Sequence, residues 1–381
     1  MFQDDGSQAP RAADLGDTDS GCIDIDLRAV TASLAKIRWL AGARKVIATV
    51  KADAYGHGCV AVARSLQAAG VQYFAASDLG DAAAMRDAGV TAPMLLLGAL
   101  RPEMIERLNR LEVMPSIADL ESAEALSQAS ARPVPVFVKV DCGFGRFGVP
   151  LAEAFALIGR LTSVERIRVE GIYTHNSFAD PVSLAWAKGR TADFAALVRT
   201  LEAAGLRPKV VQALASPALF AGLDDPGDAV AIGHVLYGIR PVGPDVSSPG
   251  EARFEPALTA IRTRLVNVGR RPPDGQAAAY LRNVAGPTGV IPVGLCHGYR
   301  PTSPDAFVIA AGRKVPVLRV CLENTILDLS GLGASVGDEV LLLGNAGGHR
   351  ITLETLAAWH GTSQLTLVTS LGKSLPRRYR A

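Results

Sequence analysis

From about residue 22 to about residue 240, the chain alternates short apolar runs with stretches in which Ala or Leu recurs every three or four residues. Short β-branched runs are typical of buried strands, and the longer spacing is typical of amphipathic helices. Repeated strand–helix units of this kind predict an α/β fold, a (β/α)8 TIM-type barrel, whose usual length is about 250 residues. The predicted strands are 46–50, 73–76, 94–97, 113–116, 135–140, 169–174, 210–214 and 235–239, and predicted helices between them include 59–69, 79–88, 101–111 and 151–161.

After Pro241 the pattern changes to short alternating runs rich in Val, Thr, Gly and Pro, preceded by the linker-like segment VGPDVSSPGE. This pattern predicts a second, mainly β C-terminal domain. We therefore expect a disordered acidic tail over 1–21, a barrel over 22–243 and a β domain over 244–381. The strands predicted in the last domain are 258–266, 289–293, 306–309, 315–320, 325–329 and 339–343.

The composition excludes several classes of function. Of the 381 residues, 39 are basic and 37 acidic, so the formal charge of +2 provides no strong field for nucleic acid or anionic lipid. Apolar residues make up 49% of the chain, but charged residues interrupt every apolar run before it reaches about 18 residues, the length of a membrane span. We expect neither nucleic-acid nor membrane partners.

The five cysteines are widely spaced and contain no CxxC pair, which favours neither a disulfide framework nor a zinc site. The N-terminal residues also lack the basic start and apolar stretch of a signal peptide. We therefore expect a reducing, cytoplasmic location and no bound metal.

The segment VIATVKADAYGHG, residues 46–58, places Lys51 at the carboxyl end of the first barrel strand. Barrel enzymes carry their reactive groups at this end. A lysine that emerges from an apolar interior has a lowered pKa and can form a Schiff base with an aldehyde. A strand-terminal lysine is also common as a solvated structural residue, so its position alone leaves both interpretations open.

The whole string VKADAYGHG resembles the pyridoxal-phosphate (PLP) lysine motif of the alanine racemase family. The resemblance extends over nearly the entire chain from residue 22. Further matching motifs follow in the family's order: KVDCGFGRFGV (139–149), EGIYTHNSFAD (170–180), Ser216 after a short apolar strand, IGHVLYGIRP (232–241), IPVGLCHGY (291–299) and GKSLPRRY (372–379).

The resemblance implies PLP as the cofactor and a role for each matching residue. Lys51 would hold PLP covalently and act as one acid/base, and Tyr55 would reach the phosphate. His175 would pack against the pyridine ring, although a satisfied buried histidine is the alternative. Phosphate would also be bound by Ser216 and by the backbone amides around Gly233 and His234.

Two further positions are implied at the substrate, Arg146 in the GFGRFG turn and Leu322. A solvated surface arginine is the alternative interpretation of Arg146. Lys139 matches a position that is carbamylated in some family members.

Racemisation needs a proton acceptor on each face of a planar carbanion. In the family the second base is a tyrosine from the β domain of the partner subunit, which implies a homodimer with shared active sites. The segment PPDGQAAAY, residues 272–280, keeps the family's Gly-to-Tyr spacing and indicates Tyr280. An ungapped alignment of the following loop would instead place Gln276 there and leave no second base. We favour Tyr280, because loop length varies at little cost.

Other positions depart from the family pattern. Ala231 replaces the family arginine that faces the pyridine nitrogen, Leu365 replaces a phosphate-binding tyrosine, and Leu295 replaces another tyrosine. The family triplet Cys-Met-Asp reads Cys321, Leu322, Glu323.

The predicted function is a PLP-dependent amino-acid racemase that interconverts the L and D enantiomers of alanine or another small amino acid through Lys51 and Tyr280. Two alternatives remain open at this point. One is a PLP-dependent lyase, aldolase or decarboxylase of the same fold, and the other is a weakly active PLP-binding relative.

Overall fold

The computed structural model describes residues 20–243, 245–247, 253–270, 272, 276–371 and 374–381. It divides the chain into two compact units, Leu27–Ala257 and a second unit that joins the N-terminal strand to Leu258–Ala381. Each unit is described separately. Within the described residues, no helix has both the length and the apolar character needed to cross a bilayer.

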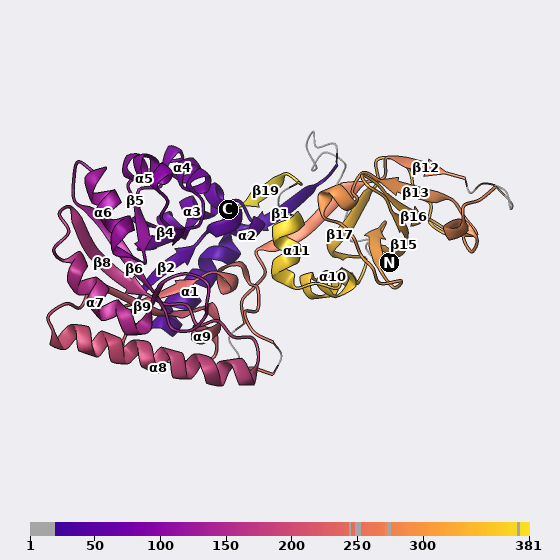
Figure 1. Ribbon diagram of the computed structural model, residues 1–381. Coiled ribbons are helices and arrows are strands. Elements are labelled where there is room, and N and C mark those ends of the chain that lie inside the picture. The colour runs from indigo at the N-terminus through magenta and orange to yellow at the C-terminus, as the bar shows by residue number, and fades with distance from the viewer. Residues whose placement is uncertain (1–19, 244, 248–252, 271, 273–275, 372–373) are drawn as a thin grey trace, which may run out of the picture. The chain divides into compact units, whose positions relative to one another are not determined.

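The first unit is a closed barrel of parallel strands surrounded by helices (Figure 1). Neighbouring strands pair in chain order, and β10 pairs with β2 to close the circle. The predicted (β/α)8 barrel is confirmed. Its strands are β2 (Lys45–Thr49), β3 (Tyr73–Ala76), β4 (Met94–Ala99), β5 (Val113–Ile117), β6 (Val134–Asp141), β8 (Ile167–Tyr173), β9 (Val210–Ala215) and β10 (Ala229–Ile232), and the short β7 (Val149–Pro150) pairs with β6.

The prediction of the eighth strand is wrong. Residues 235–239 do not form a strand, because His234–Tyr237 is a 3-10 helix that ends at Gly238 in the left-handed conformation. The strand is β10, whose sequence AVAI contains two alanines and so has weak intrinsic strand preference. It forms because Val230 pairs with Val46 of β2 inside the closed barrel, a long-range contact that propensity does not report.

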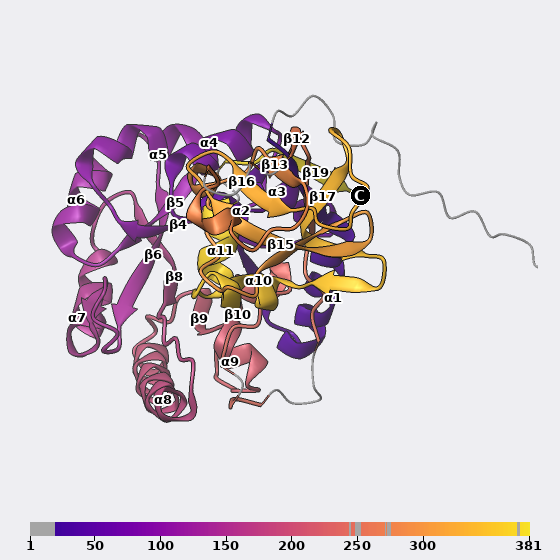
Figure 2. The same ribbon diagram turned by 90° about the vertical axis from the view of Figure 1, so that its right-hand side faces the viewer.

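Helices cover the outer face of the barrel strands, as Figure 2 shows from a second direction. Three of them begin with an aspartate whose carboxylate accepts backbone N–H groups of the first turn: Asp78, Asp119 and Asp180. The barrel interior is filled by its own apolar core, which includes Ile47 and Phe137. The helices are α1 (Leu27–Ala41), α2 (Lys51–Gly56), α3 (Cys59–Ala68), α4 (Leu79–Asp87), α5 (Ile105–Leu111, after a 3-10 turn at Pro102–Met104), α6 (Leu120–Gln128), α7 (Leu151–Leu161), α8 (Pro181–Ala203) and α9 (Ser216–Phe220).

The second unit is a mainly β domain, as predicted. Its sheet runs in the order β12-β13-β16-β15-β14-β17-β11-β1-β19, with β18 paired to β17. The strands are β1 (Cys22–Asp26), β11 (Leu258–Arg264), β12 (Asn267–Gly269), β13 (Thr288–Ile291), β14 (Phe307–Ala310), β15 (Arg313–Val320), β16 (Thr325–Asp328), β17 (Glu339–Ala346), β18 (His349–Ile351) and β19 (Arg377–Arg380), and the helices are α10 (Leu353–Trp359) and α11 (Gln364–Leu371).

The domain boundaries differ from the predicted ones. Residues 22–26 are not part of the barrel: they form β1, which pairs antiparallel with β11 and parallel with β19. The buried Asp24 carboxylate fixes this strand through ion pairs to Arg262 and Arg378. The barrel unit also continues to Ala257 instead of ending at residue 243. Most of the predicted tail, residues 1–19, lies outside the described part of the chain.

Candidate active site

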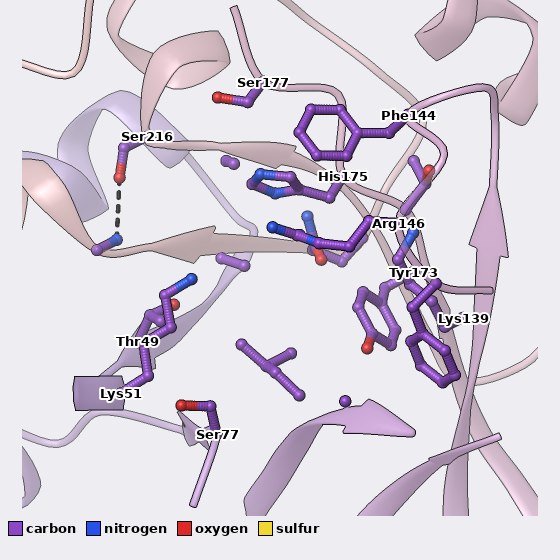
Figure 3. Close-up of a pocket in the computed structure, with 18 of the residues that line it drawn as sticks. Thr49, Lys51, Ser77, Lys139, Phe144, Arg146, Tyr173, His175, Ser177 and Ser216 are labelled. Atoms are coloured by element: carbon purple, nitrogen blue, oxygen red, sulfur yellow. Dashed lines mark hydrogen bonds between the residues drawn. The ribbon is translucent and has the colours of Figure 1, made fainter. Parts of the chain in front are cut away.

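A cavity of about 570 Å³ opens at the carboxyl ends of the barrel strands (Figure 3). The loops after β2, β8, β9 and β10 reach it together, which is where the connections of a parallel barrel converge. All seven site residues that the sequence predicted within the barrel line this cavity. They are Lys51, Tyr55, Arg146, His175, Ser216, Gly233 and His234.

Lys51 is followed by a left-handed turn. Ala52, Asp53, Ala54 and Tyr55 all have φ between 52° and 54°. This conformation costs an L-residue about 1–2 kcal/mol, so the surrounding structure must hold it in place.

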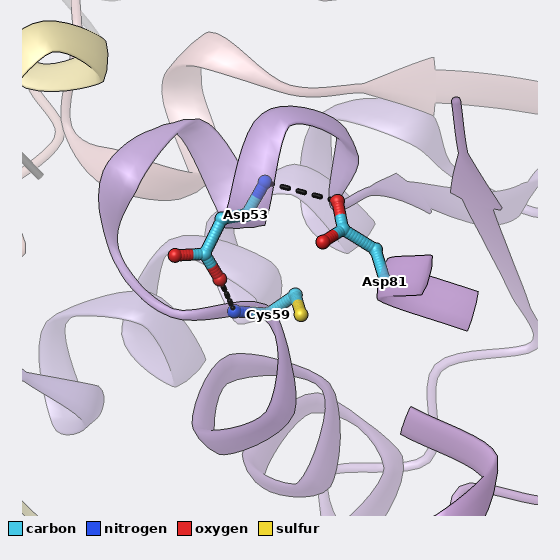
Figure 4. Close-up of side chains that lie close together, drawn as sticks. All are labelled: Asp53, Cys59 and Asp81. Atoms are coloured by element: carbon cyan, nitrogen blue, oxygen red, sulfur yellow. Dashed lines mark hydrogen bonds between the residues drawn. The ribbon is translucent and has the colours of Figure 1, made fainter. Parts of the chain in front are cut away.

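Polar contacts from two helices brace the turn (Figure 4). The Asp53 carboxylate accepts the backbone N–H of Cys59 at 2.7 Å, at the start of α3. The Asp81 carboxylate, in the first turn of α4, accepts the backbone N–H of Asp53 at 3.1 Å. Burial and the two neighbouring carboxylates raise the pKa of the Cys59 thiol to about 12, so the thiol stays protonated. The contacts fix the segment that carries both Lys51 and Tyr55.

The Lys51 amine has a lowered pKa, because it is partly buried and because the Arg146 guanidinium disfavours a second positive charge. A lowered pKa increases the fraction of neutral amine, which is the nucleophilic form. Lys51 Nζ also lies 5.9 Å from the centroid of the Tyr55 ring. These surroundings fit a reactive lysine and do not fit a solvated structural one.

Hydrogen-bond donors gather on one side of the cavity, after β9 and β10. The Gly233 N–H donates to Ser216 Oγ at 2.9 Å. Tyr55 Oη packs so closely on Gly233 that a Cβ at this position would collide with it. Burial raises the pKa of Tyr55, which keeps its hydroxyl neutral and able to donate. The Ser216 and Tyr55 hydroxyls thus keep their own protons for a ligand and, together with the Gly233 amide that contacts both side chains, form a cradle suited to an anion.

The two histidines of the cavity are neutral near pH 7. Burial, together with the nearby Arg146 and lysine charges, lowers the pKa of His175 to about 3. Burial and the Lys51 charge lower the pKa of His234 to about 4. The His175 and Phe144 rings form a T-shaped pair with centroids 5.4 Å apart, which restrains the imidazole at the cavity.

Arg146 projects from a tight turn organised by a single carboxylate. Asp141 accepts backbone N–H bonds from Gly143 and Phe144 at 2.9 and 2.8 Å, and from Gly145 at 2.9 Å. The guanidinium carbon lies 5.0 Å from the centroid of the Phe144 ring. Arg146 is therefore held at the cavity and is not a freely solvated surface residue.

The structure adds lining residues that were not singled out in the sequence, and it also places Lys139 at the cavity. Tyr173 donates a hydrogen bond of 2.7 Å to Ser116, whose own proton goes to the Leu96 carbonyl, and burial raises the pKa of Tyr173 to about 12. Lys139 donates to the Val140 carbonyl at 2.6 Å, and burial lowers its pKa to about 8. For Tyr173, its position at the end of β8 was the available sequence signal. The others are Thr49, Ser77, Leu97, Gly98, Phe144, Phe147, Thr174, Ser177, Gln212, Ala215 and Pro217.

Tyr280 and Leu322 belong to the second unit, and neither lines this cavity. Tyr280 lies in the 3-10 helix Ala279–Leu281, half-buried, with the Arg319 guanidinium carbon 5.5 Å from its ring centroid. Leu322 is 67% exposed. Gln276, the alternative to Tyr280, is exposed, and residues 273–275 lie outside the described part of the chain.

The cavity fits PLP on its own chemistry. The cofactor needs an amine for its aldehyde, donors for its phosphate and a flat apolar contact for its ring. Lys51 supplies the amine, the cradle of Ser216, Gly233 and Tyr55 supplies the donors, and His175 supplies the flat contact. Of the described lining residues none carries a carboxylate, whereas Lys51, Lys139 and Arg146 are cationic, so the cavity favours an anionic ligand.

Comparisons with known proteins give the same family over both units. Residues 25–241 match the model of the alanine racemase N-terminal domain, and residues 260–379 match that of the C-terminal domain. The chain is 32% identical to the alanine racemase of Desulfovibrio desulfuricans over 93% of its own length and 97% of the relative's. The alanine racemase of Thermodesulfovibrio yellowstonii is also 32% identical, over 88% and 90% of the two chains.

Solved structures agree. Alanine racemase from E. faecalis has a TM-score of 0.86 and 26% identity, over 96% of this chain and 100% of that one. The alanine racemase from Bacillus anthracis, solved with bound L-Ala-P, has a TM-score of 0.83 and 25% identity, over 95% of each chain. This chain belongs to the alanine racemase family.

Proposed function

We propose that this protein racemises alanine, or another amino acid with a similarly small side chain, with PLP attached to Lys51. The family is PLP-dependent and its members are amino-acid racemases. The observation that carries the proposal is the cavity itself, which combines a lysine of lowered pKa with an anion cradle and a free guanidinium at the carboxyl end of one barrel. A lyase of the same fold is disfavoured, since both family models and the full-length relatives are racemases.

Each residue of the cavity has a distinct task in this proposal. Ser216 Oγ, the Gly233 N–H and Tyr55 Oη bind the phosphate, and Arg146 binds the substrate carboxylate. Bound PLP acts as an electron sink for the negative charge that develops at the substrate α-carbon. Lys51 Nζ, once its amine is free, removes the α-proton of one enantiomer from its own face, and in the reverse direction it donates a proton to that face. His175 covers the ring and excludes water from that face.

Racemisation requires a second proton carrier on the opposite face, and we propose that Tyr280 Oη of a partner subunit fills this role. Leu322 would contact the substrate from the same domain. The support is indirect: Tyr280 and Lys51 lie in different units, and the segment before Tyr280 keeps the family's Gly-to-Tyr spacing. A homodimer with shared active sites therefore follows from the proposal.

The proposed location is the cytoplasm. All five cysteines are unpaired thiols, and Cys22, Cys59 and Cys142 are buried, as expected of a protein that folds under reducing conditions.

The function is tested with purified protein and both enantiomers of a panel of small amino acids. We expect interconversion of L- and D-alanine, and Lys51→Ala should abolish both turnover and covalent cofactor binding. The control is Arg101→Ala, which removes a cationic side chain from an exposed ion pair outside this cavity. Retention of covalently bound PLP by Lys51→Ala would overturn the assignment.

The shared site is tested by mixing Lys51→Ala and Tyr280→Phe protomers. A dimer that pairs the two variants contains one composite site with both intact residues, so activity should return to about a quarter or less of the wild-type value on random mixing. If dimers that mass spectrometry shows to be mixed recover no activity, that result would contradict the sharing of sites.

A further inference from the structure

One polar group of the cavity wall has no task in the proposed reaction. Gln212 of β9 is 2% exposed and lines the cavity, as does Ala231 of the neighbouring strand β10. Its Nε2 donates to the Leu214 carbonyl at 3.0 Å, and this bond fixes the orientation of the amide, since a carbonyl oxygen accepts only from the NH2 end. Gln212 Oε1 is left with no donor among the described residues, yet it is not sealed inside the protein, so it faces the cavity.

The chemistry of the other lining groups makes this oxygen distinctive. Of the described lining side chains, Lys51, Lys139 and Arg146 are donors, the hydroxyls can both donate and accept, and none is a carboxylate. Gln212 Oε1 is the single side-chain carbonyl oxygen among them. When a ligand displaces solvent from the cavity, this oxygen loses its hydrogen-bond partner at a cost in free energy, unless the ligand itself donates to it.

The bonding pattern of PLP indicates which ligand atom could donate. The aldehyde carbon and the phosphate arm are attached to adjacent ring atoms, and the ring nitrogen lies across the ring from the aldehyde. With the aldehyde carbon at Lys51 and the phosphate at Ser216 and Gly233, the nitrogen points away from Lys51. The nitrogen would then face the part of the cavity wall formed by residues that come before the phosphate donors on β9 and β10. Gln212 precedes Ser216 by four residues, and Ala231 precedes Gly233 by two.

We propose that Gln212 Oε1 accepts a hydrogen bond from the ring nitrogen of bound PLP and thereby favours the protonated form of that nitrogen. The inference rests on the proposed function, because it requires PLP on Lys51. Gln212 is a positioning residue in this account: it acts on the substrate through the cofactor ring. The proton comes from solvent, and no covalent bond forms or breaks.

The charged groups around the ring affect how readily its nitrogen holds a proton. Lys51, Lys139 and Arg146 oppose a positive ring nitrogen, while the phosphate and the substrate carboxylate offset them. The histidines at 175 and 234 are neutral and add no charge. β10, with the sequence AVAI, pairs with β9 and contributes only the methyl group of Ala231 and no cation to the cavity wall.

The test is nitrogen NMR of the holoenzyme reconstituted with PLP that carries ¹⁵N in the ring, recorded across a pH series. We expect the wild-type resonance to lie in the pyridinium region at pH 7. Gln212→Leu should lower the midpoint of its titration by about one pH unit or more. Gln212→Glu, which supplies a charged acceptor, should raise the midpoint, and it keeps the test decisive if the leucine variant does not fold.

Two controls separate this role from a general effect on folding. Gln72→Leu makes the same change just before β3, at the end of the barrel away from the cavity. Gln72 Oε1 accepts from the Val46 N–H there, and its loss should leave the ring resonance unchanged. Ala231→Arg adds a cation to the wall of the same cavity and should remove the ring proton.

An unprotonated ring in the wild type, or a midpoint that is the same in the wild type and both Gln212 variants, would overturn the inference. Failure of the proposed function would look different: PLP would not attach to Lys51, or the wild type would not racemise any amino acid, whatever the ring resonance.

Discussion

The segments that carry the two proposed bases are held in different ways. The Lys51 turn is strained, but carboxylates on the turn itself and on α4 brace it within a single unit. Tyr280 lies in a single turn of 3-10 helix, and its ring is contacted by the Arg319 guanidinium. The cofactor side of the site is therefore built into one folded unit, whereas the proposed second base would reach it only through the assembly of the proposed dimer.

Among the variants that test this difference, Tyr280→Phe is expected to have the largest effect. Removal of the hydroxyl deletes one proton carrier, so racemisation should fall by about 10²- to 10⁴-fold while PLP binding is unchanged. Gln276→Leu is the discriminating control, because Gln276 takes the base position in the ungapped alignment and should have no effect in ours. The reaction rate is measured by chiral chromatography. The opposite pattern, loss with Gln276→Leu alone, would contradict the assignment.

The cradle gives the next largest effect. A Cβ at Gly233 would collide with Tyr55 Oη, so Gly233→Ala should displace the tyrosine and weaken PLP binding by about 10- to 100-fold, the loss of one or two charged hydrogen bonds. Gly189→Ala is the matched control, since a Cβ at that position in α8 meets nothing within 4 Å. Affinity is measured by titrating apoprotein with PLP. Equal affinities for the two variants would remove Gly233 from the phosphate site.

The brace of the Lys51 turn should have a smaller effect. Asp81→Ala removes the acceptor for the Asp53 N–H and is expected to cost about 1–2 kcal/mol of unfolding free energy and about tenfold in kcat, through misplacement of Lys51. Asp119→Ala removes a similar carboxylate bond at the start of α6, to the Ser122 N–H, and should cost stability alone. If both variants lose stability and neither loses kcat, the brace does not position Lys51.

The smallest expected effect is on the pH dependence of stability. The unfolded chain protonates His175 and His234 near pH 6.5, but the folded apoprotein does so only near pH 3 and 4. The unfolded state therefore binds more protons in this window, and the free energy of unfolding falls as the pH is lowered through it, by up to about 1.4 kcal/mol per pH unit for each histidine. Denaturant titrations between pH 4 and 7 measure the slope. His175→Gln should reduce it, and an unchanged slope would argue against a neutral His175.

Sequence patterns predicted the barrel elements well where an apolar run or a helical spacing has a clear polar or proline boundary. Tyr73–Ala76 and Leu151–Leu161 have the predicted bounds. The prediction failed at Ala229–Ile232, because an alanine-rich strand is recognised only by its pairing with β2 and β9. It also assigned residues 22–26 to the barrel, because their pairing with β11 joins positions more than two hundred residues apart.

The site was predictable where a motif places several reactive residue types close together in sequence, as around Lys51 and Arg146. Gln212 was not singled out, because a single amide within the apolar run VVQALA has no local signal. Its meaning depends on a bond to Leu214 and on a neighbouring strand, and both appear only in the folded barrel.

The central claim is that two proton carriers work from opposite faces. Its most direct test is deuterium incorporation at the α-carbon in D2O, with each enantiomer of alanine and with wild-type and Tyr280→Phe protein. The account predicts that the wild type incorporates deuterium from both enantiomers with inversion, whereas Tyr280→Phe exchanges one enantiomer and does not invert it. Exchange and inversion of both enantiomers at wild-type rates by Tyr280→Phe would contradict the claim.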